Sequence, residues 1–175
     1  MKLLKNIWTG SSGKKLLWSS VGMLVFGAVV MTSFFGLIEV NSDASLDTTT
    51  FYTAETVKDY LEMQGPEGRR GYLMIHAFDY VFLVFLFLFL TRTITCLGRR
   101  IDGDRLRFIL VFPLIYAIFD LIENISIDIS ILIFPSQLPV IPHLMGYFTL
   151  IKMSAVYVSF AFIVFLGIAS LFNKR

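Results

Sequence analysis

The chain has 175 residues, of which 56% are hydrophobic and only 16% are charged. A soluble domain has about 25% charged residues, and a small fold cannot bury so much apolar surface, so the composition excludes an ordinary soluble domain. The net charge of +2 argues against nucleic acid as a partner, and the single cysteine excludes an internal disulfide.

A helix that crosses a membrane needs about 20 mainly apolar residues. Four segments meet this requirement, at about residues 16–40, 72–97, 106–134 and 144–172. The first is too long for the apolar region of a secretory signal, and no small-residue cleavage motif follows it. The sequence therefore predicts an all-α polytopic membrane protein, a four-transmembrane-helix bundle that forms a single membrane domain over residues 1–175.

The loop between the first two spans, residues 41–71, contains a predicted element of its own. Thr53 is a suitable N-cap and Gly65 a suitable stop for a short helix. Between them lies an apolar stripe with helical spacing, formed by Val57, Tyr60 and Leu61. We expect a short amphipathic helix over about residues 54–64, lying on the extracytoplasmic side.

Lysine and arginine are unevenly distributed among the segments that flank the spans. They are concentrated before the first span, after the second span and at the C-terminus, at Lys2, Lys5, Lys14, Lys15, Arg99, Arg100, Arg105, Arg107, Lys174 and Arg175. The loop near residues 135–143 contains none. Because basic residues favour the cytoplasmic side, the sequence predicts a multi-pass protein of the cell membrane with both termini in the cytoplasm.

The candidate site consists of polar residues inside the predicted spans. Ionisable groups in hydrocarbon cost roughly 2.5–3.5 kcal/mol each and normally face the interior of a bundle. The candidates for ligand binding are His76, Asp79, Tyr80, Asp120, Glu123, Asn124, Thr149 and Lys152. Within each helix they recur three or four residues apart, which places them on one face.

These residues are also predicted to share a depth in the membrane. At about 1.5 Å of rise per residue, Asp79 and Lys152 both lie roughly 10–12 Å from the outer ends of their spans, and Glu123 falls near the same level. Burial disfavours an uncompensated charge, so we expect a proton or a cation to balance the carboxylates. We expect Lys152 to pair with Glu123 or Asp79.

Three functions fit this cluster. The first is binding of a lipid-like or cationic small ligand in a polar pocket that opens toward the outer leaflet. The second is a membrane enzyme that performs acid/base chemistry on a hydrophobic substrate, and the third is a structural or accessory subunit. The motifs GxSxG, HExxH and CxxC do not occur, so the sequence assigns no catalytic residue, metal or cofactor. Membrane lipid is the expected partner.

Two short motifs carry a resemblance to a known group of proteins. The stretch Tyr52–Tyr72 contains Gly65, Gly68 and Arg69 in a G-x-x-G-R pattern, and the third span contains DLIEN at residues 120–124. With Asp79 and Lys152, this pattern resembles an uncharacterised family of small four-span bacterial membrane proteins. The resemblance covers roughly the last two-thirds of the chain and implies the four-span architecture without implying an activity.

Overall fold

The computed structural model describes residues 2–36, 46, 51–102, 104–136 and 141–172. Its elements are α1 (Lys2–Gly10), α2 (Gly13–Gly36), α3 (Ala54–Asp102), the 3-10 helix η2 (Arg105–Leu110), α4 (Val111–Ile133) and α5 (Ile141–Phe172). The described residues form no strand. Four helical stretches are long and apolar enough to cross a membrane, with η2 and α4 forming one of them. The predicted all-α bundle of an integral membrane protein is confirmed.

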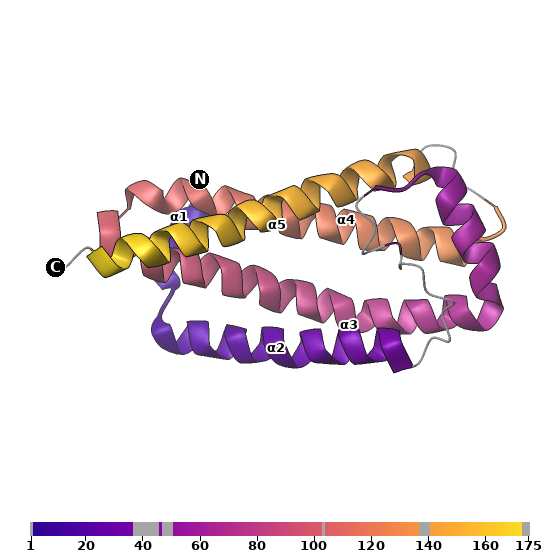
Figure 1. Ribbon diagram of the computed structural model, residues 1–175, viewed down its shortest axis with the longest axis horizontal. Coiled ribbons are helices and arrows are strands. Elements are labelled where there is room, and N and C mark those ends of the chain that lie inside the picture. The colour runs from indigo at the N-terminus through magenta and orange to yellow at the C-terminus, as the bar shows by residue number, and fades with distance from the viewer. Residues whose placement is uncertain (1, 37–45, 47–50, 103, 137–140, 173–175) are drawn as a thin grey trace.

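The bundle is built around α3, which packs against α2 on one side and against α4 and α5 on the other (Figure 1). Two glycines of α2 allow its close approach to α3, because the side chain of Phe85 fills the space beside Gly22 and that of Phe82 lies beside Gly27. The rings of Phe26 and Phe85 stack with their centroids 5.3 Å apart. The helix α2 thus covers α3, while α3, α4 and α5 together enclose the centre of the bundle.

The helix α3 changes direction at Gly65, whose φ of 61° is a conformation that favours glycine. The stretch before it, residues 54–64, crosses one end of the bundle (Figure 1), and we call it the cap helix. Arg69 fixes the bend, because Nη1 donates a 2.7 Å hydrogen bond to the carbonyl oxygen of Leu61 and the guanidinium lies 4.4 Å from the ring centroid of Phe134. The predicted short helix and its stop at Gly65 are confirmed.

The opposite end of the bundle holds α1, η2 and the C-terminal ends of α3 and α5, and we call it the basic end (Figure 1). No helix is predicted from the sequence over the residues of α1. The helix is nevertheless well anchored, because Trp8 is 1% exposed and packs in an apolar cluster with Ile94, Leu110 and Leu166. This short helix closes the basic end as the cap helix closes the other.

The interior is divided into apolar clusters with a polar region between two of them. The cluster at the cap end includes Ile127 and Met145, and the middle cluster includes Tyr116 and Val156. Between these levels lie the buried side chains of Asp120, Glu123, Asn124, Thr149 and Lys152. The fold therefore places the polar side chains inside the bundle, nearer the cap end than the basic end.

Candidate functional site

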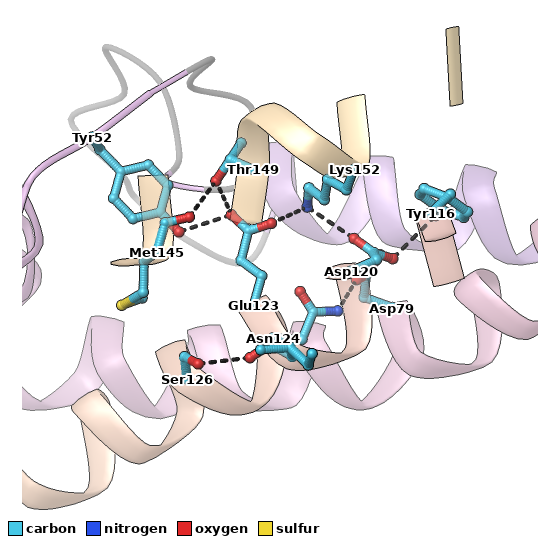
Figure 2. Close-up of polar contacts among 11 residues, drawn as sticks. Tyr52, Asp79, Tyr116, Asp120, Glu123, Asn124, Ser126, Met145, Thr149 and Lys152 are labelled. Atoms are coloured by element: carbon cyan, nitrogen blue, oxygen red, sulfur yellow. Dashed lines mark hydrogen bonds and ion pairs between the residues drawn. The ribbon is translucent and has the colours of Figure 1, made fainter. Parts of the chain in front are cut away.

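The carboxylate of Glu123 is the centre of the polar region and is completely buried. Its Oε1 accepts a 2.7 Å hydrogen bond from the hydroxyl of Tyr52 and another from the hydroxyl of Thr149. Its Oε2 lies 2.7 Å from Nζ of Lys152. Figure 2 shows the carboxylate held between these groups, which come from α5 and from the segment that precedes the cap helix. Two hydroxyls thus donate to Oε1, and the ammonium of Lys152 forms an ion pair at Oε2.

Lys152 of α5 bridges two carboxylates of α4. Besides Glu123, its Nζ contacts Oδ1 of Asp120 at 2.8 Å, and the Tyr116 hydroxyl donates a 3.0 Å hydrogen bond to Oδ2 of Asp120 (Figure 2). The side chains of Lys152 and Asp120 are each 7% exposed. Because buried charges must be paired and hydrogen-bonded, the ion pairs of Lys152 with Asp120 and Glu123 fix the relative position of α4 and α5.

A second group of contacts joins α4 to α3. The side-chain amide of Asn124 donates a 2.6 Å hydrogen bond to Asp79. One turn farther along α4, Asp128 lies 2.6 Å from Nδ1 of His76 and accepts a 2.6 Å hydrogen bond from the Tyr80 hydroxyl. His76 is buried, whereas the side chain of Asp128 is 21% exposed. This group therefore forms the accessible edge of the polar region.

The sequence of α4 explains why two groups arise on one helix. Residues three, four and eight positions apart lie on neighbouring parts of a helix surface. Asp120 and Glu123 accordingly face α5, and Asn124 and Asp128 face α3. The helix α4 thus carries a polar face between its two neighbours, and its exposed residues Leu121, Ile122 and Ile125 are apolar.

We call the complete set of these side chains the polar layer. It contains all eight candidates from the sequence, His76, Asp79, Tyr80, Asp120, Glu123, Asn124, Thr149 and Lys152, together with Tyr52, Tyr116 and Asp128. Lys152 does pair with Glu123, as expected. Its second partner is Asp120, which sequence analysis does not single out for this role.

The three added residues differ in how well the sequence indicated them. Tyr116 precedes Asp120 by one helical turn, so helical spacing already places it on the same face. Asp128 is not among the candidates from the sequence, but the structure pairs it with His76 and Tyr80. Tyr52 lies outside the spans, 71 residues from Glu123, and no sequence signal connects the two.

The charges of the polar layer do not balance. It holds four carboxylates, those of Asp79, Asp120, Glu123 and Asp128, and a single lysine. With every carboxylate ionised and His76 neutral, four negative charges face one positive charge, a formal charge of −3. In a medium of low dielectric such an excess favours uptake of protons or of a cationic group. Among the described residues, no group of three or more histidine, cysteine or acidic side chains is arranged to hold a metal ion.

Comparisons with known proteins add no family to this description. No family model matches the chain, and no curated protein or solved structure matches it. The four-span bacterial family therefore stays a resemblance carried by the G-x-x-G-R and D-x-x-E-N patterns.

Proposed function

We propose that the polar layer binds a lipid-like ligand with a cationic head group. The excess of carboxylates over lysine within the polar layer is the observation that carries this proposal. A protonated amine would supply the missing positive charge and could donate hydrogen bonds to several carboxylate oxygens. An apolar tail would suit the membrane, since ligand sites combine a few polar contacts with apolar walls.

The edge between α3 and α4 is the proposed place of entry. Surrounding side chains cover Lys152, Asp120 and Glu123. By contrast, Asp79 and Asp128 are partly exposed. Apolar side chains occupy the exposed surfaces of the same two helices, with Phe78 and Ile125 more than 40% exposed. A head group at the two accessible carboxylates would therefore leave its tail beside apolar surface.

Membrane orientation is part of the proposal. The distribution of lysine and arginine favours the basic end in the cytoplasm, with both termini on that side. The polar layer lies nearer the cap end, so it would face the outer leaflet. A ligand would then reach the site from the outer half of the membrane.

A pair of matched amphiphiles tests the proposed chemistry. We expect dodecylamine to raise the melting temperature of the purified protein in a neutral detergent, and dodecanol, with the same tail, to raise it much less. The variant Asp79→Asn/Asp128→Asn should lose most of the response to the amine. The control is Glu55→Gln/Asp59→Asn, which removes two exposed charges from the cap helix and should respond as the wild type does.

Three results would contradict the proposal. An equal response to the amine and the alcohol would assign the effect to the apolar tail alone. A full response to the amine in Asp79→Asn/Asp128→Asn would show that these two carboxylates do not bind it. If no amphiphile shifts the melting temperature and no ligand co-purifies, the structural alternative, in which the polar layer only fixes the helices, is favoured.

Acid/base chemistry on a hydrophobic substrate is the second candidate. The contact between His76 and Asp128 favours it, because a carboxylate that holds an imidazole in one orientation is a common arrangement for proton transfer. In deuterated buffer, an enzyme of this kind would exchange a carbon-bound hydrogen of a co-purifying lipid for deuterium. The exchange should be lost in His76→Asn and kept in the control Glu55→Gln.

A further inference from the structure

At the basic end, three basic side chains donate hydrogen bonds to backbone carbonyls in the region where α1 meets α2. Nζ of Lys15 donates a 2.7 Å hydrogen bond to the carbonyl oxygen of Gly10, and Nη1 of Arg99 donates a 3.3 Å hydrogen bond to that of Ser11. Nη1 of Arg92 donates a 2.6 Å hydrogen bond to the carbonyl oxygen of Lys15. Because Gly10 and Ser11 are consecutive, the ammonium of Lys15 and the guanidinium of Arg99 are held close together.

The positive charge of this group is left uncompensated by acidic side chains. Within the described part of the chain, Lys15, Arg92 and Arg99 form no ion pair with a carboxylate. Backbone carbonyls accept one hydrogen bond from each, which leaves further N–H donors on every one of the three groups. The amino-terminal end of α2, which begins at Gly13, adds the positive end of a helix dipole beside them.

The position of the three cations along the bundle indicates the kind of anion that would meet them. Leu17 and Trp18 lie on α2 shortly after Lys15 and are 62% and 64% exposed. The lipid-facing surface of α2 therefore begins at these residues. Exposed tryptophan is typical of the interface between head groups and acyl chains. The cations therefore lie at the level at which lipid phosphates occur.

We propose that Lys15, Arg92 and Arg99 form a binding site for the phosphate of an anionic phospholipid. Arginine binds phosphate oxygens through paired N–H groups, and lysine contributes a point charge. A lipid bound here can lay its acyl chains along the exposed apolar surface of α2, which a soluble phosphate cannot do. This site lies at the opposite end of the bundle from the accessible carboxylates and is independent of the function proposed above.

Nanodiscs of two compositions test this site. We expect the wild type to melt at a higher temperature in an equimolar mixture of phosphatidylglycerol and phosphatidylcholine than in phosphatidylcholine alone. The variant Lys15→Gln/Arg99→Gln should lose more than half of that gain. Glutamine is uncharged and shorter than lysine or arginine, so the gain of this variant is measured against its own melting temperature in phosphatidylcholine. Its melting temperature in phosphatidylcholine reports on folding.

A matched control uses the other end of the molecule. Lys58→Gln/Arg70→Gln also removes two positive charges, from exposed side chains near the cap end, and should keep the full gain, as should the charge-conserving variant Lys15→Arg/Arg99→Lys. A gain that survives in Lys15→Gln/Arg99→Gln, or a wild type that melts equally in both lipids, would overturn the proposal. So would an equal gain from sodium phosphate added to protein in phosphatidylcholine, because that result would identify a site for free phosphate.

Discussion

The hydroxyl of Tyr52 donates a 2.7 Å hydrogen bond to Oε1 of Glu123, across 71 positions of sequence. Tyr52 lies in the segment that leads into the cap helix, and Glu123 lies at the centre of the bundle. Phe51, which precedes Tyr52 in the chain, contacts the ring of Tyr147 edge-on, with 5.3 Å between the ring centroids. The cap end of the molecule is therefore attached to the polar layer by a specific polar contact as well as by apolar packing.

Removal of the Tyr52 hydroxyl should destabilise the protein. Tyr52→Phe keeps the ring but takes one donor from a buried carboxylate, and such a loss costs about 1–3 kcal/mol. We expect a lower melting temperature in neutral detergent. The control Tyr147→Phe removes a hydroxyl from a ring that is 54% exposed and should change little. Equal melting temperatures for the two variants would mean that the contact does not contribute to stability.

A methyl group at Gly146 should displace the same segment from α5. A Cβ at this position would collide with the backbone carbonyl of Tyr52, and backbone cannot move aside as a flexible side chain can. Gly146→Ala should therefore lower the melting temperature and speed proteolysis near residue 52. On the same helix, Gly167 has open space around it, so Gly167→Ala should be neutral or stabilising, because alanine favours helix. The reverse order of stabilities would exclude this packing.

Replacing Lys152 alone should destabilise the protein more than replacing it together with one of its carboxylate partners. In soluble proteins, breaking a buried ion pair costs about 3–5 kcal/mol, because an unpaired charge stays behind. Lys152→Met should therefore lower the melting temperature strongly, and adding Asp120→Asn or Glu123→Gln should restore part of it.

The control for this cycle combines Lys152→Met with Glu55→Gln, a charge removal on the exposed cap helix. Its effects should add, since distant sites behave independently. If the double variants with Asp120 and Glu123 were also additive, Lys152 would not be coupled to these carboxylates.

The proposed orientation predicts which residues react with a reagent that cannot cross the membrane. In a Cys96→Ala background, cysteines at Thr56 and Ser136, both exposed near the cap end, should be labelled in intact cells. Cysteines at Ser12 and Asp104, exposed at the basic end, should be labelled only after the cells are opened. Labelling of the second pair in intact cells would reverse the orientation.

The fold was largely predictable because its signals are local. Apolar stretches of sufficient length specify helices that cross a membrane, since the backbone must satisfy its own hydrogen bonds there. The cap helix was also predictable from local signals, because its N-cap Thr53, its spaced apolar residues and its stop at Gly65 lie within a few helical turns of one another. By contrast, α1 is only 9 residues long, too short to be recognised from its apolar residues alone, and Leu4, Ile7 and Trp8 stabilise it by packing against the rest of the basic end.

The sequence alone determined which residues of each span are polar and which face of the helix they share. Helical spacing predicts that Asp120, Glu123 and Asn124 point in similar directions, but not which neighbouring helix each one meets. Only the tertiary structure decided that Lys152 bridges Asp120 and Glu123, that Asp128 belongs with His76, and that Tyr52 enters the layer. The physical reason is that these contacts join helices far apart in the chain, and their partners depend on rotation and packing that no local pattern encodes.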